Sequence, residues 1–229
     1  MSLLTDPQFG DRIITLMAAA VLVLQIAMVA QRWLVTNIRI FAAQSALLAA
    51  IAGLIAYFNR APHIYAAALL ILVVKALALP VLLERLVERI EIRKEIEPLI
   101  NIPLSVFISG GLTLVAYVVA ESFYQPDLPV NAASSLGHNT LAVAISLFLI
   151  GFFTMLNRRK ALTQVLGLLT LENGLFLAAI SLTYGMPLIV EIGVFFDVLV
   201  AAMVLGILVY RIRETFDSMD VSKLRRLRG

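Results

Sequence analysis

The chain contains no cysteine, and only 14% of its residues are charged. The absence of cysteine excludes disulfides, thiolate zinc sites and cysteine-held iron–sulfur clusters, so electron carriers of that kind must lie on other chains. A basic region is also absent before the first apolar stretch, which follows Asp6 and Asp11, and no small-residue cleavage pattern comes after it. We therefore expect a retained first helix rather than a removed targeting peptide, and no bound metal or cofactor.

The sequence is rich in long apolar stretches. Hydrophobic residues make up 61% of the chain and the mean hydropathy is +0.97, whereas a soluble domain is roughly 45–50% apolar with about 25% charged residues. A membrane-spanning helix needs roughly 20 mostly apolar residues. The sequence predicts an all-α, polytopic membrane protein with seven spans, at 12–31, 37–58, 63–83, 103–121, 138–156, 161–184 and 187–210.

The distribution of positive charge predicts the orientation in the membrane. If seven spans alternate, fifteen of the 18 Lys and Arg residues fall on one side of the membrane and two on the other. An excess of Lys and Arg marks the cytoplasmic side, so we expect the N-terminus outside and the C-terminus inside. Anionic lipid or an acidic partner surface explains the basic tail, and no nucleic acid is expected.

The segment 122–137 predicts a division of the chain. It is rich in Pro, Asn, Ser and Gly and carries no positive charge, a composition typical of loops. As an external loop it separates an N-terminal four-helix part, 1–121, from a C-terminal three-helix part with a basic cytoplasmic tail, 138–229. No internal repeat is evident, so the inverted-repeat pattern of transporters is not supported.

Three ionisable side chains fall near the middle of predicted spans: Lys75, Glu172 and Asp197. Such a residue costs roughly 2.5–3.5 kcal/mol on insertion scales and usually faces protein or water along an ion or proton route. Pro80 lacks the N–H that would bond to the carbonyl of Ala76, so we expect a break in the helix beside the ammonium of Lys75. Lys75 needs an acidic or water partner, either in a proton relay or in a permanent structural pair.

Glu172 and Asp197 lie at similar depths in the sixth and seventh predicted spans. Asn173, beside Glu172, has an amide that can hydrogen-bond to a carboxylate, a water chain or the next helix. Two carboxylates at the midplane favour proton stepping. Structural pairing and sodium coordination are the alternatives.

Three further ionisable residues fall toward the outer ends of predicted spans: Glu191, Glu121 and His138. One interpretation is that they are hydrated helix ends. The other is that they form an outer branch of the relay.

Three stretches carry a family likeness: VVKALALPVLL (73–83), LGLLTLENGLFLAAI (166–180), and EIGVFFDVLVAAMVLGILVYRI (191–212) followed by the tail DVSKLRRLRG. They resemble the hydrogenase-4 component E family, antiporter-related membrane subunits of group 4 nickel–iron hydrogenase and formate hydrogenlyase-type complexes. The last three spans are in turn similar to subunit K of NADH-quinone oxidoreductase (complex I) and to the C subunit of multi-subunit Na+/H+ antiporters.

The resemblance implies that Glu172 stands where subunit K has the midmembrane glutamate of its first acidic helix. Asp197 falls near the second glutamate, with Asp in place of Glu, and Glu191 lies six residues earlier. Six residues turn a helix by roughly 240°, so these two side chains face different ways. Depth favours Asp197 for the second acidic position, and the assignment stays open.

The resemblance and the buried charges together predict a membrane subunit of a respiratory complex that is not catalytic on its own. Lys75, Glu172 and Asp197 would pass protonation between a redox-module membrane subunit and antiporter-like subunits, in the inner membrane of a prokaryote. The alternative is a subunit of a multi-subunit Na+/H+ antiporter or an independent cation transporter, with the same carboxylates as ion ligands. A retinal protein with a Schiff base at Lys75 is disfavoured, because one Trp gives a poor aromatic pocket.

Overall fold

The computed structural model describes residues 7–58, 61–89, 98–123, 132–159, 161–183 and 206. Its helices are α1 (Pro7–Ala30), α2 (Leu34–Phe58), α3 (Pro62–Leu70), the π-helix η2 (Ile71–Ala78), α4 (Leu79–Arg89), α5 (Ile102–Ser122), α6 (Ala132–Leu156) and α7 (Ala161–Thr183). Within these ranges the only β-type pairing is an isolated bridge between Pro98 and Arg158. The prediction of an all-α protein is confirmed.

In the described part of the chain, six helical rods are long and apolar enough to cross a membrane: Gly10–Ala30, Leu34–Phe58, Ile64–Arg85, Ile102–Ser122, Asn139–Leu156 and Leu162–Ser181. They correspond to the first six predicted spans, and the third rod consists of α3, η2 and α4 end to end. The seventh predicted span lies outside the described residues apart from Gly206. The chain is a multi-pass membrane protein, while its seventh span and its orientation stay predictions.

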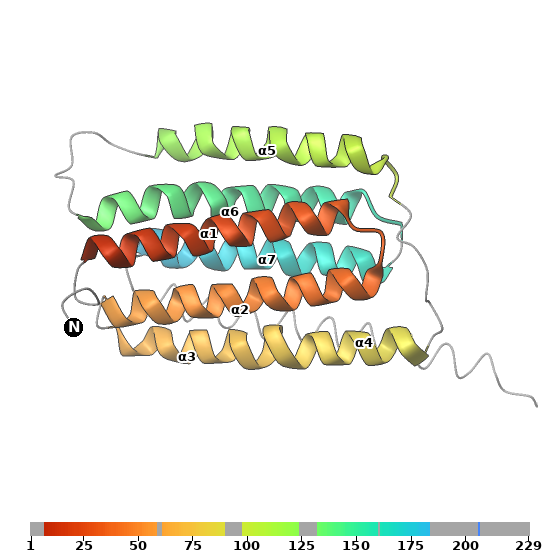
Figure 1. Ribbon diagram of the computed structural model, residues 1–229, viewed down its shortest axis with the longest axis horizontal. Coiled ribbons are helices and arrows are strands. Elements are labelled where there is room, and N and C mark those ends of the chain that lie inside the picture. Colours follow the sequence, from red (N-terminus) through yellow and green to blue (C-terminus); the bar gives the residue numbers. More distant parts are fainter. Residues whose placement is uncertain are drawn as a thin grey trace, which may run out of the picture.

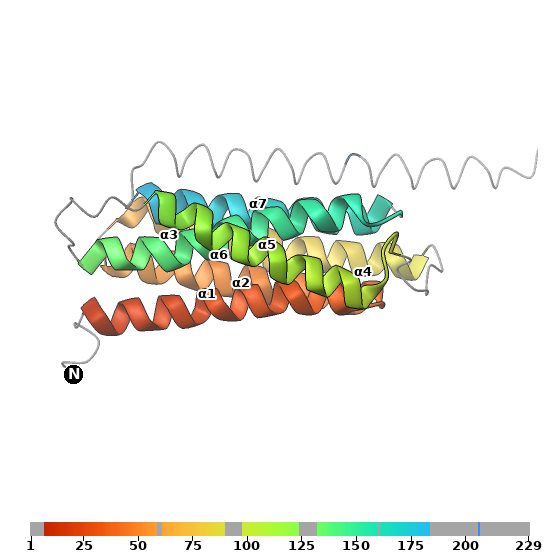
Figure 2. The ribbon, with the colours of Figure 1, turned by 90° about the horizontal axis from the view of Figure 1, so that it is seen from above.

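The rods lie side by side with nearly parallel axes (Figure 1). In this view α5 lies along one edge of the bundle and the third rod along the other, with α1, α2, α6 and α7 between them. Figure 2 shows α1 and α7 on opposite sides of the bundle, and α2 packs against both of them. Helix α2 therefore provides a connection between the two sides.

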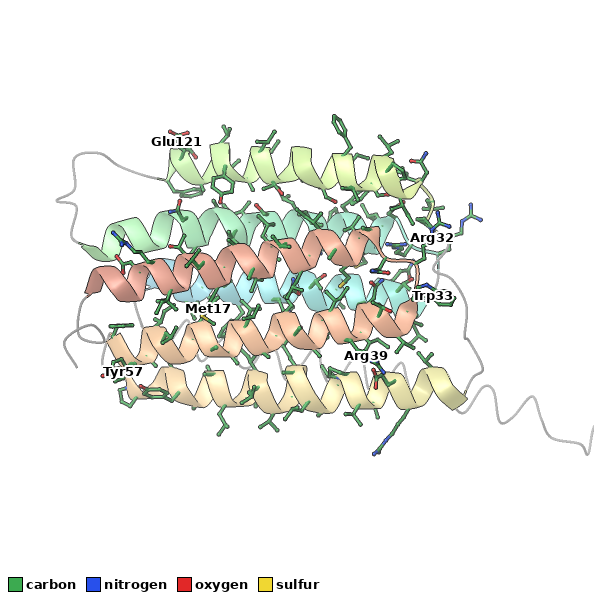
Figure 3. All side chains as sticks on the ribbon, in the orientation of Figure 1. Met17, Arg32, Trp33, Arg39, Tyr57 and Glu121 are labelled. Atoms are coloured by element: carbon green, nitrogen blue, oxygen red, sulfur yellow. The ribbon has the colours of Figure 1, made fainter. Side chains whose placement is uncertain are left out.

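The labelled residues of opposite charge lie at opposite ends of the bundle (Figure 3). Arg32 and Arg39 lie at one end together with Trp33, and Glu121 lies at the opposite end. This placement follows from the alternating direction of the rods. It agrees with the charge asymmetry on which the predicted orientation depends.

Helices α6 and α7 approach each other closely at three glycines. A Cβ atom at Gly174 would lie 2.6 Å from the backbone nitrogen of Phe148, and one at Gly167 would lie 2.7 Å from that of Met155. From the other side, a Cβ at Gly151 would lie 2.5 Å from the backbone nitrogen of Leu171. Small residues let membrane helices pack backbone to backbone, so these glycines set the position of α7 on α6.

The turn after α6 is fastened by Asn157, which is buried. Its backbone carbonyl accepts a hydrogen bond from the N–H of Leu99 at 2.9 Å, and its side-chain oxygen accepts one from the N–H of Ile100 at 2.9 Å. Its amide nitrogen donates to Oγ of Ser105 at 2.9 Å. Asn157 thereby ties the end of α6 to the beginning of α5.

Arg158 is buried, although the charge distribution assigned it to an inner loop. Its Nη2 donates to the carbonyl of Val29, near the end of α1, at 3.1 Å. Burial lowers the pKa of the guanidinium, which nevertheless stays charged because arginine does not deprotonate in proteins. Arg158 therefore links α1 to the turn after α6.

The close approach of α6 and α7 predicts that Gly174→Ala destabilises the bundle. The new methyl group would meet backbone atoms of Phe148 and Ala144, which have no side-chain freedom to move aside, and overpacking of this kind costs typically about 1–3 kcal/mol. Heat-induced unfolding of the purified protein in detergent measures the effect. Gly111→Ala is the matched control, because nothing lies within 4 Å of a Cβ at that position; equal midpoints for the two variants would contradict the prediction.

The hydrogen bonds of Asn157 predict that Asn157→Ala also lowers stability. The substitution removes the side-chain hydrogen bonds to the part-buried N–H of Ile100 and to Oγ of Ser105, and each such bond contributes about 0.5–1.5 kcal/mol. Denaturation in detergent is the measurement. Ser122→Ala serves as the control, because this exposed hydroxyl donates only to Val119 of its own helix, and we expect it to unfold as the unaltered protein does.

Candidate functional site

The interior of the bundle holds an ion pair between Lys75 on η2 and Glu172 on α7. Nζ of Lys75 lies 3.3 Å from Oε2 of Glu172, and each residue is 2% exposed. The same Nζ donates a hydrogen bond to Oδ1 of Asn173 at 3.3 Å. Three of the residues predicted from the sequence therefore meet in one buried cluster, and the carboxylate beside Lys75 is Glu172.

Lys75 points into the bundle because it belongs to the buried stripe of the third rod. The other members of this stripe are apolar: Ile64, Ala67, Ala68, Ile71, Ala76, Leu79, Leu83 and Val87. Their burial against the neighbouring helices fixes the rotation of the rod. The ammonium is thereby held among protein side chains and away from lipid.

Lys75 also lies on an irregular turn, the eight-residue π-helix η2. The N–H of Leu79 donates to the carbonyl of Val74, five residues earlier. In the same frame the next bond would run from residue 80 to the carbonyl of Lys75, but Pro80 has no N–H. The break predicted beside Pro80 takes the form of a widened turn, a feature frequent at functional sites, and in this frame it concerns the carbonyl of Lys75 instead of that of Ala76.

Glu172 and Asn173 are oriented by the glycine contacts of α7. Gly167 and Gly174 are seven residues apart, which is close to two helical turns, so both lie on the face that meets α6. At about 100° per residue, Glu172 lies roughly 200° away from Gly174 around the helix. The packing of α7 on α6 therefore turns this acid away from α6 and toward the third rod.

Asn173 extends the cluster toward α2 and α1. Its Nδ2 donates to Oε1 of Gln44 at 3.2 Å and to Oγ of Ser45 at 3.4 Å. Nε2 of Gln44 in turn donates to Oε1 of Gln25 at 3.0 Å. We call Asn173, Gln44 and Gln25 the amide chain; it crosses the bundle from α7 through α2 to α1, and its members are 0–1% exposed.

Gln25, Gln44 and Ser45 are not among the site residues predicted from the sequence. The available signal is that two amides stand inside otherwise apolar spans, where an unpaired polar group is costly and usually hydrogen-bonds to another helix. Their lack of charge makes that signal weaker than the one from Lys75 or Glu172.

The remaining predicted site residues lie apart from this cluster or outside the described residues. Glu121 is exposed at the end of α5 (Figure 3). His138 lies near the beginning of α6, and its side chain is outside the described part. Asp197 and Glu191 also fall outside it, so the second acidic position stays a prediction.

Comparisons with known proteins agree with this picture of a membrane subunit. The family model for NADH-ubiquinone/plastoquinone oxidoreductase chain 4L matches residues 139–229. A protein of Mycobacterium tuberculosis that carries the name "Uncharacterized protein Rv0085" is 36% identical over 212 residues, which cover 92% of this chain and 94% of that protein. Hydrogenase-4 component E of Escherichia coli K12 is 36% identical over 89 residues, or 39% of this chain and 41% of the relative.

No solved structure matches the chain. The likeness to Rv0085 extends over nearly the whole of both proteins, whereas the likeness to component E spans less than half of that relative's length. The chain and Rv0085 belong to one family. The predicted likeness to hydrogenase-4 component E is confirmed over 89 residues, and residues 139–229 match the chain 4L model.

Proposed function

We propose that this chain is a proton-coupling membrane subunit of a respiratory complex, which links a redox module to antiporter-like subunits and is not catalytic on its own. The ion pair between Lys75 and Glu172, buried inside the bundle, is the observation that carries the proposal. Kinship supports membership in such a complex, because the relatives include a hydrogenase component and the matching family model is named for an oxidoreductase chain.

Stability alone is a poor reason for a buried ion pair. The effective penalty for taking a charge out of water is several kcal/mol per ion, and well-packed apolar residues of similar volume are often as stable as the pair. The cost is expected where a charge must be gained, lost or moved. Ionisable residues inside membrane spans accordingly mark proton and ion routes.

The strength of the interaction suits an electrostatic relay. Opposite charges 3.3 Å apart interact by about 5 kcal/mol at an effective dielectric constant of about 20. Moving one charge through 100 mV requires about 2.3 kcal/mol. A change of charge at Glu172 therefore alters the energy of Lys75 by more than one such transfer demands.

The proposed step begins when a proton reaches the carboxylate of Glu172. Lys75 then loses its counter-charge, and charge balance in the pair favours release of a proton from the ammonium. A redox event in the partner module supplies the drive by changing the charge near one end of the route. Asp197, or Glu191 in its place, is the proposed next acid.

The coupling ion we propose is the proton and not sodium. A sodium ion beside Glu172 would be held by the carboxylate oxygens and by the amide oxygen of Asn173. The ammonium of Lys75 already occupies that position, 3.3 Å from each residue. Among the described residues, the cation beside Glu172 and Asn173 is therefore the ammonium of Lys75.

The relay predicts that Glu172→Gln uncouples proton translocation from electron transfer. The amide keeps the shape of the side chain but does not titrate, so the interaction of about 5 kcal/mol with Lys75 is lost; since about 1.4 kcal/mol is a factor of ten in rate, proton transfer should slow by about tenfold or more. The measurement is the proton-to-electron ratio of the assembled complex in membrane vesicles, with electron transfer to an artificial acceptor followed in parallel.

Glu84→Gln is the matched control for this experiment. Glu84 forms a surface ion pair with Arg39 at 2.9 Å, and exposed pairs contribute roughly 0–1 kcal/mol. This variant should keep the normal ratio. A normal ratio in Glu172→Gln as well would rule the relay out.

The ion pair predicts a non-additive effect on stability. Removing one partner, as in Lys75→Met, leaves an uncompensated buried charge and should cost about 3–5 kcal/mol, whereas Lys75→Met combined with Glu172→Met should cost clearly less. Unfolding midpoints of the unaltered protein, the two single variants and the double variant form the required cycle. Strictly additive losses would show that the two charges do not interact. The double variant should also be uncoupled despite its recovered stability, and restored coupling in it would speak for a structural role alone.

A further inference from the structure

We infer that Gln44 is a positioning residue, and that the amide chain of Asn173, Gln44 and Gln25 is a one-directional relay of hydrogen bonds that orients the ammonium of Lys75 and transmits its charge state to α1. Its use in coupling rests on the proposed function, whereas its direction rests on the contacts alone. The contacts join η2, α7, α2 and α1.

The direction of the amide chain is decided at Lys75. An ammonium group has donors and no acceptor, so Asn173 must present Oδ1 to it, as it does at 3.3 Å. The amide nitrogen of Asn173 then faces away and donates to Oε1 of Gln44. Gln44 is left with its nitrogen toward α1, where it donates to Oε1 of Gln25 at 3.0 Å and to the carbonyl of Val21 at 3.4 Å. The carbonyl of Val21, which can only accept, requires the same orientation of Gln44 as Asn173 does. Gln44 in turn fixes which atom Gln25 presents to it.

At its far end, on Gln25, the amide chain has one N–H donor for which no acceptor remains in the described part of the protein. Oε1 of Gln25 accepts from Gln44, so its Nε2 is the last donor. Among the described residues this atom has no hydrogen-bond partner, although Gln25 is 0% exposed. A buried donor without a partner is costly. The donor without a partner therefore lies on α1, on the opposite side of the bundle from α7 (Figure 2).

The same direction fits the ammonium of Lys75, which can only donate hydrogen bonds. All three amides turn their oxygen toward the ammonium and their N–H groups away from it, so their dipoles add, and hydrogen bonds in a chain polarise one another. A neutral amine has a lone pair that can accept a hydrogen bond, and it would remove the constraint on Asn173. The orientation of Gln25 is consequently linked to the charge of a residue three hydrogen bonds away.

Nitrogen-15 NMR of the full-length protein in lipid nanodiscs tests the positioning role. The sequence has four lysines, at positions 75, 94, 160 and 223, so the Nζ resonance of Lys75 can be assigned by its loss in Lys75→Met. We expect Gln44→Met to shift this resonance, because Asn173 loses the nearer of its two acceptors and keeps only Ser45 at 3.4 Å. Thr154→Val is the matched control, since this buried hydroxyl donates to the carbonyl of Ile150 within its own helix.

Transmission is tested by labelling the side-chain amides of glutamine. Lys75→Met should move the amide resonance of Gln25, on a different helix, and Thr154→Val should not. An unmoved Gln25 resonance would overturn transmission. If Gln44→Met leaves the Lys75 resonance where the control leaves it, the positioning role is overturned; should Gln44→Met not accumulate, Gln25→Met takes its place with the same expected shift and the same contrary result.

These outcomes are separable from the proposed function. The spectra are recorded without redox partners, so shifts in them can stand even when Glu172→Gln keeps a normal proton-to-electron ratio, in which case the relay of protons fails and the amide chain remains. Unshifted spectra with an uncoupled Glu172→Gln would remove the amide chain and leave the proposed function in place.

Discussion

The structure depends on one constraint: a lysine and a glutamate buried inside a membrane bundle must find every partner they need inside the protein. Their ion pair spans η2 and α7 at 3.3 Å. Hydrocarbon offers no water to compensate a misplaced charge, so the two elements have to meet at the same depth and with the right rotation. The buried apolar stripe of the third rod fixes one rotation, and the glycine contacts of α7 fix the other.

Helix packing therefore serves the site and does more than hold the bundle together. Membrane helices gain little from the hydrophobic effect on associating, and close backbone approach through small residues supplies much of the contact. In this chain Gly151, Gly167 and Gly174 bring α6 and α7 together. Because that face of α7 is occupied by α6, the opposite face is the one that presents Glu172 and Asn173 to the interior.

The charged part of the site could be predicted from the sequence, and its neutral part could not. Lys75 and Glu172 stand out because a charge at mid-span has a large cost, and Asn173 is found by its position beside one of them. Gln25 and Gln44 cost less to bury, and which helices α2 lies between does not follow from periodicity in a span that is apolar on all sides. The π-helix could not be predicted for a related reason. Pro80 indicates that a backbone hydrogen bond is missing, but it does not show whether the preceding turn has α-helical or π-helical bonding.

The division of labour between charged and neutral groups has a physical reason. A carboxylate or ammonium in place of Gln44 or Gln25 would add a desolvation penalty of several kcal/mol, and its fixed charge would bias Lys75 toward one state permanently. Neutral amides avoid both effects. In the proposed relay they would respond to the charge of Lys75 by orientation alone, through hydrogen bonds that run from α7 across α2 to α1. A neutral amide beside a buried ion pair can therefore change its orientation with the charge of the pair and adds no charge of its own.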